Sequence, residues 1–555
     1  MPTTRETYQL GRYTSIVQDS LAQLKEDRVI ARIRDLDHTV WKPEPDEITN
    51  RLGWLDCPES MPSVIPEIVE VVNQIREAGY TRALLLGMGG SSLAPEVFRE
   101  TFGVADGYLD LSVLDSTDPA AVREMAEIHD PARTLYIVST KSGTTIETLS
   151  FFKYFYNLTV EAVGPKTAGE HFIAITDPGS PLGKTARECD FRHVFINDPN
   201  IGGRYSVLSC FGLVPAALVG VDLPALLERA AAQAVNTDAR LGAAMGALSN
   251  EGVDKLTVFT SPAISSFGAW LEQLLAESTG KEDMGILPVE GETPGTVSAY
   301  GKDRMFVYLH LEGDDTHDVF LNDLSDKGHP VCRIDLKDTY DLGGEFFRWE
   351  MATAVAGHVM GINPFDQPNV ESAKVQARGM LEEFRETGKL PEPEALLESG
   401  DITVYSDLKG DGIDEITNRF LAQAGPGDYV AIQAYINPFT GASAGLNFLR
   451  LKIRDRFRIA TTLGFGPRFL HSTGQLHKGD GGRGLFIQIT AEDVVDTPIP
   501  DELGSSASST SFGTLKASQA LGDRQALLDA GRRVIRFHIT GDIRTGINRI
   551  AESIL

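Results

Sequence analysis

Short apolar runs alternate with amphipathic segments along most of the chain. Apolar runs bounded by turn residues are typical of buried parallel strands. The segments between them repeat apolar residues every three or four positions, which predicts helices that cover the sheets. We expect strands at residues 83–86, 111–114, 135–138, 172–175, 193–196, 256–259, 305–309, 331–334, 429–432, 485–489 and 534–538.

The order of these elements predicts an α/β protein, with two doubly wound parallel-sheet domains followed by a third α/β unit. Residues 1–60 are expected to form an N-terminal helical segment, and the two domains to span 61–245 and 246–390. The third unit is expected over 391–555, where a stretch rich in Pro and Glu at 390–394 forms the linker. A chain of 555 residues is too long for one hydrophobic core, which agrees with this division.

The charge balance narrows the range of partners. With 78 Asp and Glu residues against 51 Lys and Arg residues, the formal net charge is −27. A field of that sign repels nucleic acids and anionic membranes, so we expect neither as a partner. An anionic ligand then needs a local cationic pocket set against the overall field.

The cysteines and apolar stretches bear on the compartment. The four cysteines are widely spaced and form no Cys-x-x-Cys pair, which argues against a disulfide framework or a zinc site. No window approaches the roughly 20 apolar residues of a membrane span, and the first residues lack an apolar signal core. We therefore expect a cytoplasmic protein without a metal.

The strongest candidate for a binding site is the segment Thr140-Lys141-Ser142-Gly143-Thr144-Thr145, between an expected strand and an expected helix. Such a junction directs unpaired backbone N–H groups and the positive end of the helix dipole at one point. Four hydroxyls and one ammonium group gather at the same point, which predicts a phosphate site. Helix capping alone needs one hydroxyl, and the spacing is not that of a Walker A loop.

A glycine turn, Gly89-Gly90-Ser91, follows the strand expected at 83–86. Its glycines allow the backbone to approach a sugar or phosphate closely. A dinucleotide site is a weaker interpretation, because Ser92 stands where that fingerprint has its last glycine, although Asp115 could imitate the acid that binds ribose. A tight turn without a ligand is the other alternative.

A second glycine turn and an isolated acid suggest catalytic groups. In Gly202-Gly203-Arg204, Arg204 is a candidate for stabilising negative charge on a substrate oxygen, against the alternative of a solvated arginine in a surface turn. Glu277 stands near the C-terminal end of an apolar helix, where the helix dipole disfavours an acid. That mismatch suggests a carboxylate kept for chemistry.

Two later segments carry polar side chains in compact turns. Residues 363–374 combine proline turns with Gln367 and Lys374, and the alternative is a loop before an ordinary charged helix. Residues 471–478 hold His471 and His477 without the carboxylate or cysteine partners of a metal site. Structural histidines are the alternative there.

Together these motifs resemble the phosphoglucose isomerase family, built from two sugar-isomerase (SIS) domains, over about residues 60–375. The similarity is greatest to the isomerase half of bifunctional transaldolase/phosphoglucose isomerase proteins, and we expect isomerase activity alone. The resemblance implies a cofactor-free aldose–ketose isomerase that interconverts glucose 6-phosphate and fructose 6-phosphate through a cis-enediol(ate).

The resemblance also assigns roles to individual residues. Glu277 would move the proton between C1 and C2, and Arg204 would stabilise the enediolate. His471 and Lys374 would assist ring opening. The implied substrate-binding residues are Gly90, Ser91, Thr140, Lys141, Ser142, Thr145, Gly203 and Gln367.

The chain departs from the family pattern in two places. Asn369 stands where the family has Gly or Ala, and the ring-opening histidine does not follow Glu277 within a few dozen residues. The matching segment, His471-Ser472-Thr473-Gly474-Gln475, lies in the third unit. Since a dimer partner supplies this histidine in the family, the resemblance implies a homodimer in which the histidine crosses the subunit interface.

Three other functions stay open. The chain could be another SIS-type isomerase, acting on a phosphomannose or an amino-sugar phosphate, because the pocket around C2 decides that choice. A sugar-phosphate sensor without turnover would not need Glu277 and Lys374 together. A nucleotide-dependent oxidoreductase is disfavoured by Ser92 in the first turn.

Overall fold

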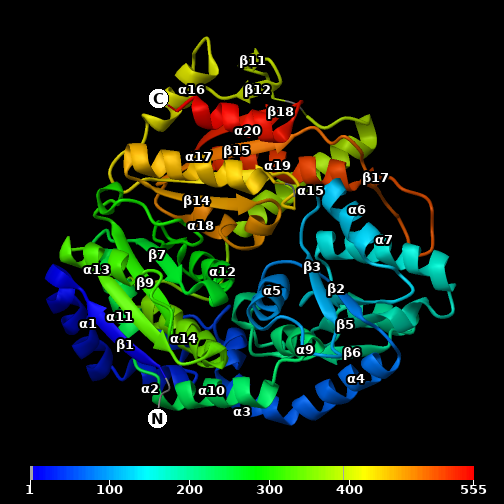
Figure 1. Ribbon diagram of the computed structural model, residues 1–555, viewed down its shortest axis with the longest axis horizontal. Helices are drawn as coiled ribbons and strands as arrows, with labels where there is room; N and C mark the ends of the chain where they lie inside the picture. The colour runs from blue at the N-terminus through cyan, green and yellow to red at the C-terminus, as the bar shows by residue number, and fades with distance from the viewer. Residues whose placement is uncertain (1–3, 392, 440, 555) are drawn as a thin grey trace.

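The computed structural model describes residues 4–391, 393–439 and 441–554, and residue 392 of the expected linker lies outside these ranges. Its elements form three α/β units, which Figure 1 colours mainly light blue to teal, green, and yellow to red, while the dark blue N-terminal segment lies beside the green unit. The predicted α/β class with parallel sheets is confirmed. All eleven expected strands are present, each within three residues of its predicted ends.

The first unit is a doubly wound domain around a five-stranded parallel sheet. Alternate residues of one interior strand enter two separate hydrophobic clusters: Ala83 and Leu85 belong to one, and Leu84 and Leu86 to the other, so both sheet faces are covered. The strands lie in the order β3 (Asp110–Leu114), β2 (Arg82–Gly87), β4 (Thr134–Ser139), β5 (Phe172–Thr176) and β6 (His193–Ile196). The helices are α3 (Cys57–Ser60), α4 (Ile65–Glu77), α5 (Gly90–Phe102), α6 (Pro119–Ile128), α7 (Ile146–Val163), α8 (Pro181–Glu188), α9 (Cys210–Val219) and α10 (Leu223–Asn236).

The second unit has five strands, of which only the edge strand β1 (Arg5–Gln9) runs antiparallel to its neighbour. The order is β1, β10 (Val331–Leu336), β9 (Arg304–Leu311), β7 (Lys255–Thr260) and β8 (Leu287–Val289). Its helices are α1 (Thr14–Glu26), α2 (Val29–Arg34), α11 (Arg240–Asn250), α12 (Phe267–Thr279), α13 (Asp318–Asp326) and α14 (Leu342–Met360).

Two details of the expected organisation are wrong. The N-terminal segment is not wholly helical, because β1 pairs with β10; its polar sequence and alternating exposure, typical of an edge strand, gave no apolar signal. The boundary expected between 245 and 246 falls inside α11, which packs on α14 of the second unit. The small residues of α11 are buried by that packing, so composition did not mark the boundary.

The third unit has a six-stranded mixed sheet with its own hydrophobic cluster. The order is β11 (Leu397–Ser399), β12 (Ile402–Tyr405), β18 (Arg533–Ile539), β15 (Gly484–Ala491), β13 (Tyr429–Tyr435) and β14 (Ala460–Phe465), and the last four are parallel. A separate pair is formed by β16 (Pro498–Ile499) and β17 (Thr510–Ser511). The helices packed here are α15 (Val370–Thr387), α16 (Ile413–Leu421), α17 (Ala442–Phe457), α18 (Gly474–Gly479), α19 (Phe512–Asp529) and α20 (Ile543–Glu552).

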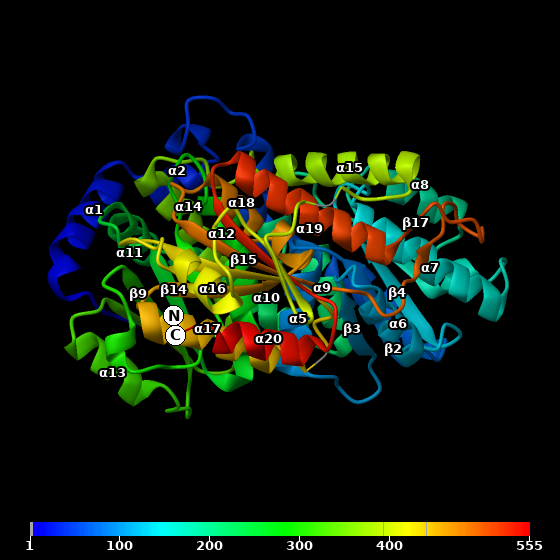
Figure 2. The ribbon, with the colours of Figure 1, turned by 90° about the horizontal axis from the view of Figure 1, so that it is seen from above.

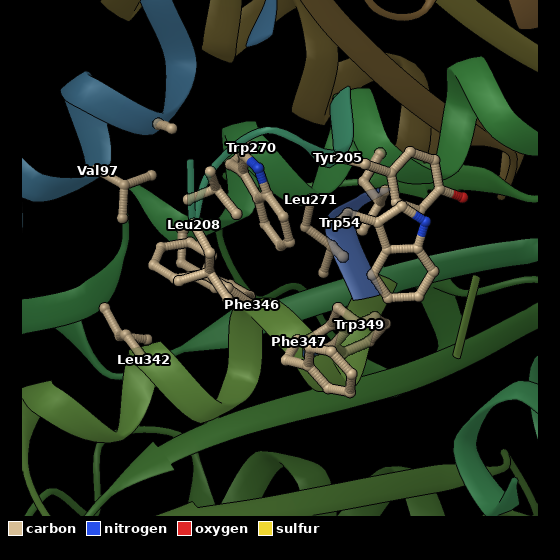
Figure 3. Close-up of a cluster of buried hydrophobic side chains, with 14 of the residues drawn as sticks. Trp54, Val97, Tyr205, Leu208, Trp270, Leu271, Leu342, Phe346, Phe347 and Trp349 are labelled. Carbon is tan, nitrogen blue, oxygen red and sulfur yellow. The ribbon is translucent and has the colours of Figure 1, made fainter. Parts of the chain in front are cut away.

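One continuous hydrophobic cluster joins the first two units. Figure 3 shows part of it, where aromatic side chains from both units meet. The Trp270 ring on α12 lies 4.9 Å from that of Phe346 on α14, and the Trp54 ring lies 5.3 Å from that of Tyr205. The Tyr205 hydroxyl also lies 3.3 Å from Ser278 Oγ on α12, so the turn that carries Arg204 is held against the helix that carries Glu277.

The third unit closes over the first two, as Figures 1 and 2 show from two directions. α19 lies alongside α15, with Gly522 so close to Ala377 that an added Cβ would come within 2.7 Å of its backbone nitrogen. A Cβ on Gly280, the residue after α12, would lie 2.2 Å from the Cα atom of Leu476 on α18. The third unit therefore rests directly on the end of the helix that carries Glu277.

Candidate active site

The predicted phosphate loop lies between β4 and the N-terminus of α7. The hydroxyl oxygens of Thr140 and Thr145 are 3.0 Å apart, and those of Ser142 and Thr144 are 2.9 Å apart. Thr145 occupies the N-cap position but its side chain makes no capping hydrogen bond. Its hydroxyl and the first backbone N–H groups of α7 can therefore bind an anion at the positive end of the helix dipole.

Lys141 is placed differently from the other members of the loop. Its ammonium group pairs with Asp177 and donates to the backbone oxygen of Pro199 at 2.8 Å. These contacts tie the loop to the segments after β5 and β6. Lys141 thus stabilises the loop that presents the hydroxyls, and its charge is already partly neutralised.

The two glycine turns touch each other at the start of α5. A Cβ on Gly90 would lie 2.0 Å from the backbone oxygen of Gly203, so only glycine fits there. Gly89 has φ +56°, and a Cβ on it would come within 3.0 Å of the His471 backbone oxygen. Ser91, in the first turn of α5, is half-buried beside this junction. The turns from the first unit thus meet the histidine segment from the third.

Arg204 is buried, with an exposed fraction of 3%, and its guanidinium is held on several sides. Nε donates to Ser278 Oγ at 2.8 Å, and Nη2 donates to the backbone oxygens of Pro364 and Asp366 at 2.8 and 3.0 Å. Nη1 donates to Gln367 Oε1 at 2.9 Å. A guanidinium fixed in this way can stabilise a developing oxyanion without reorganising.

Glu277 lies beside this arginine in the last turns of α12, as the sequence predicted. Its Oε1 is 3.2 Å from Arg204 Nη1, and its Oε2 accepts a hydrogen bond from Gln273 Nε2 at 3.0 Å. Gln273 Nε2 also donates to the His471 backbone oxygen at 2.8 Å. Glu277 is 7% exposed, so it is a largely desolvated carboxylate placed beside a cation.

His471 reaches this site within the same chain. Its Nε2 lies 2.9 Å from Glu147 Oε1, and the residue follows β14 in the third unit. The resemblance implied a histidine from a partner subunit, whereas in this structure the third unit brings His471 to the first unit of its own chain. The physical reason is the packing of the third unit over α12, which the sequence pattern did not reveal.

Glu147 holds the imidazole from the first turn of α7. Burial raises the pKa of its carboxyl, but the charge and hydrogen bond of His471, together with the charge of Lys374, leave that pKa below its ordinary value. An ionised Glu147 accepts a hydrogen bond from Nε2–H and leaves Nδ1 of the imidazole available for proton transfer.

The second histidine of the segment has a structural position. His477 lies on α18 against Tyr429, Phe469 and Phe486, and burial lowers the pKa of its imidazole well below the ordinary value. It is therefore a neutral core residue. Asp115, the possible ribose acid, accepts hydrogen bonds from Ser92 at 3.0 Å and Arg468 at 2.6 Å, so its Oδ2 is engaged inside the protein.

Gln367 and Lys374 border the same site from the loop before α15 and from α15 itself. Gln367 is bonded to Arg204, whereas Lys374 is exposed and acts on Glu147 through its charge. Asn369, the departure from the family pattern, exchanges hydrogen bonds with Gln475: its N–H donates to Oε1 at 2.9 Å, and its Oδ1 accepts from Nε2 at 2.8 Å. The asparagine thus fastens this loop to α18.

Sequence reasoning missed two residues of the site. Gln273 stands four positions before Glu277 on α12, a spacing that places both side chains on one helix face. Glu147 is an acid in the first turn of the helix that follows the phosphate loop, and acids are common there because they stabilise the helix dipole. The helical spacing of Gln273 and Glu277 was visible in the sequence. The role of Glu147 could be recognised only once the position of His471 was known.

Two features of the described residues concern metal ligands and membrane-spanning helices. Among residues 4–391, 393–439 and 441–554, no three or more His, Cys, Asp or Glu side chains are grouped so that they could hold a metal ion. None of the helices in these ranges combines the length and the apolar character that crossing a bilayer requires.

Comparison with known proteins identifies relatives of the chain. Residues 70–240 match the family described as phosphoglucose isomerase. A glucose-6-phosphate isomerase from Rubrobacter xylanophilus is 30% identical over 361 residues, which cover 55% of this chain and 84% of the relative. One from Clostridium novyi is 26% identical, covering 60% of this chain and 86% of the relative.

The fold is also similar to that of a solved structure. The crystal structure of a glucose-6-phosphate isomerase from Chlamydia trachomatis superposes with a TM-score of 0.59 at 19% identity. The match covers 70% of this chain and 90% of that one. At this identity the likeness concerns the fold alone.

Proposed function

We propose that this chain, which belongs to the phosphoglucose isomerase family, interconverts glucose 6-phosphate and fructose 6-phosphate. The observation that carries the proposal is the buried contact of 3.2 Å between Glu277 and Arg204, with His471 bonded to the adjoining network through Gln273. A base and an oxyanion-stabilising cation at one point are what aldose–ketose isomerisation needs.

In this reaction the phosphate is anchored at the N-terminus of α7 by Thr140, Ser142 and Thr145, near the turn that carries Gly90 and Ser91. His471 and Lys374 assist opening of the sugar ring, which removes a proton from the C1 hydroxyl and adds one to the ring oxygen. Nδ1 of His471 accepts the first proton, and Lys374 donates the second. Glu277 then removes the proton from C2 and returns it to C1. Arg204 stabilises the charge on the enediolate oxygen, so the chain's own residues supply every group that the reaction requires.

A sensor or another sugar-phosphate isomerase would use the same phosphate loop. A sensor has no use for a buried carboxylate held against an arginine, which costs desolvation without contributing to phosphate binding. We therefore favour turnover. The resemblance to the isomerase half of bifunctional transaldolase proteins stays a proposal, as does a cytoplasmic location, which suits the four free cysteines.

We also propose that one chain forms a complete site, whether or not it dimerises. Within one chain, Arg204 pairs with Glu277, and Gln273 joins Glu277 to the backbone of His471. Glu147 bonds to His471 and is affected by the charge of Lys374. A homodimer would then serve stability or regulation.

The function is tested by turnover of purified protein on glucose 6-phosphate, after dialysis against a chelator and without added nucleotide. Formation of fructose 6-phosphate that Glu277→Gln slows by about 10²–10⁴-fold supports the proposal. Turnover that is greater on mannose 6-phosphate or glucosamine 6-phosphate would assign a different sugar. Binding of these sugars without turnover would identify a sensor.

A further inference from the structure

A buried glutamine of the third unit bonds to the carboxylate that holds His471. Gln519, on α19, donates from Nε2 to Glu147 Oε1 at 2.7 Å. The same oxygen lies 2.9 Å from His471 Nε2, so it accepts from two side chains. On its other side Gln519 Oε1 accepts a hydrogen bond from Thr117 Oγ1 at 2.8 Å. Three hydrogen bonds thus connect Thr117 to the imidazole.

The chemistry of these groups fixes the direction of each bond. An ionised carboxylate only accepts hydrogen bonds, so Gln519 must present its NH₂ group to Glu147 and its oxygen to Thr117. The Thr117 hydroxyl then donates, and it holds the amide in that orientation. Because Thr117, Glu147 and Gln519 are all buried, an interrupted bond would leave a polar group without water to replace it.

We propose that Gln519 is a positioning residue that sets the tautomer and orientation of His471 for ring opening. By donating to Glu147, it stabilises the ionised form of that carboxylate, which only accepts hydrogen bonds, so the imidazole holds its proton on Nε2 and presents Nδ1 to the substrate. This proposal rests on the proposed isomerase function. Gln519 itself acts through Glu147 and needs no contact with the sugar.

The other charged and titratable groups around Glu147 are few. Lys374 acts on it from α15 through its charge. Burial, and next the charges of Asp523 and Glu147, raise the pKa of Tyr435 on β13. Asp523 accepts a hydrogen bond from Lys478 Nζ at 2.5 Å. Gln519 is the neutral amide that meets the carboxylate directly, which makes it suited to fix a position without changing the charge.

Four variants separate this role from a merely structural one. Gln519→Leu removes the donor, and Thr117→Val removes the hydroxyl that orients it, while Thr117→Ser keeps that hydroxyl. Gln525→Leu is the matched control, because Gln525 lies on the same helix and donates to the exposed Asp529 at 2.7 Å. The His471 tautomer is read from ¹⁵N chemical shifts, assigned by comparison with His471→Asn, in the protein without substrate.

Kinetics provide the second readout. Anomer exchange of glucose 6-phosphate reports ring opening, and solvent hydrogen exchange at C2 of substrate that is already open reports enolisation. We expect Gln519→Leu to slow ring opening about tenfold, the effect of one hydrogen bond to a charged group, and enolisation much less. Thr117→Val should act in the same direction, and Thr117→Ser and Gln525→Leu should match the unmodified protein.

Each outcome decides the proposal. A mixed or Nδ1–H tautomer of His471 in Gln519→Leu, with selective loss of ring opening, supports it. An unchanged tautomer overturns it, as does equal slowing of both steps, which would indicate a packing role. If the unmodified protein shows no isomerisation, the proposed function fails, whereas the tautomer measurement still tests the role of Gln519 by itself.

Discussion

Arg204 Nη1 lies 3.2 Å from Glu277 Oε1 although 73 positions separate the two residues, and neither side chain is more than 10% exposed. The remaining guanidinium donors are bound by Ser278, Gln367 and two backbone oxygens, so the arginine cannot swing away. A substrate must therefore bring its C1 and C2 oxygens to a cation that is already in place. Preorganisation of this kind is how an enzyme stabilises charge that develops during reaction.

The first prediction concerns Glu277. Glu277→Gln keeps the shape and the hydrogen-bonding capacity of the side chain but removes its basicity. We expect kcat to fall by about 10²–10⁴-fold, while the affinity for sugar phosphates changes little. Steady-state kinetics and calorimetric binding measure the two effects. Glu251→Gln, an exposed acid after α11, is the control. Turnover near the normal rate in Glu277→Gln would show that another group is the base.

The second prediction concerns the phosphate loop. Thr145→Val removes a hydroxyl that makes no capping bond, so α7 should keep its stability. A hydrogen bond to a charged group contributes about 1.5–3 kcal/mol, so the Kd for inorganic phosphate should rise by roughly tenfold or more. Thr167→Val, which removes an exposed hydroxyl bonded to the Val163 backbone oxygen, is the matched control. Equal phosphate affinity in the two variants would place the anion elsewhere.

Much of the fold was predictable because each buried strand corresponds to a short run of apolar residues in the sequence. β4 and the hydroxyl-rich loop after it are local features, and local sequence determines both. Glu277 and Arg204 were recognised from their motifs, and the structure brings them together. The assigned roles remain predictions until they are measured.

The contacts between units were not predictable from local patterns. His471 meets Glu147 because the third unit closes over α12, and that packing depends on close backbone approaches such as Gly280 to Leu476. Lys141 was expected to bind phosphate with its charge, yet the nearby Asp177 already pairs with it. Such pairings depend on which loops meet in space, and a single sequence does not specify them.

The third prediction concerns the stability of the protein in acid. Burial, and next the charge of Arg82, lower the pKa of His129 from 6.5 to about 4. Between pH 6.5 and pH 4, the imidazole of His129 therefore binds a proton more readily in the unfolded chain than in the folded protein. The free energy of unfolding falls as the pH falls from about 6.5 towards 4. The loss attributable to His129 is about 3 kcal/mol, at roughly 1.4 kcal/mol per pKa unit.

Replacement of His129 tests this effect. His129→Asn should flatten the dependence of the unfolding free energy on pH over that interval, as measured by urea denaturation at several pH values. His38→Gln, at a partly exposed position, should leave the dependence unchanged. An identical pH dependence in the His129 variant and the unmodified protein would contradict the assignment.

The last prediction concerns whether the site is formed by one chain. His471 bonds to Glu147 of its own chain, and Gln273 joins its backbone oxygen to Glu277. Each variant chain, His471→Ala or Glu277→Gln, should therefore carry one defective site. Mixing the two inactive proteins, with unfolding and refolding to allow exchange, should restore no activity. A covalently linked pair with one unmodified half provides the positive control. Recovery above the sum of the separate variants would show that the histidine crosses to another subunit.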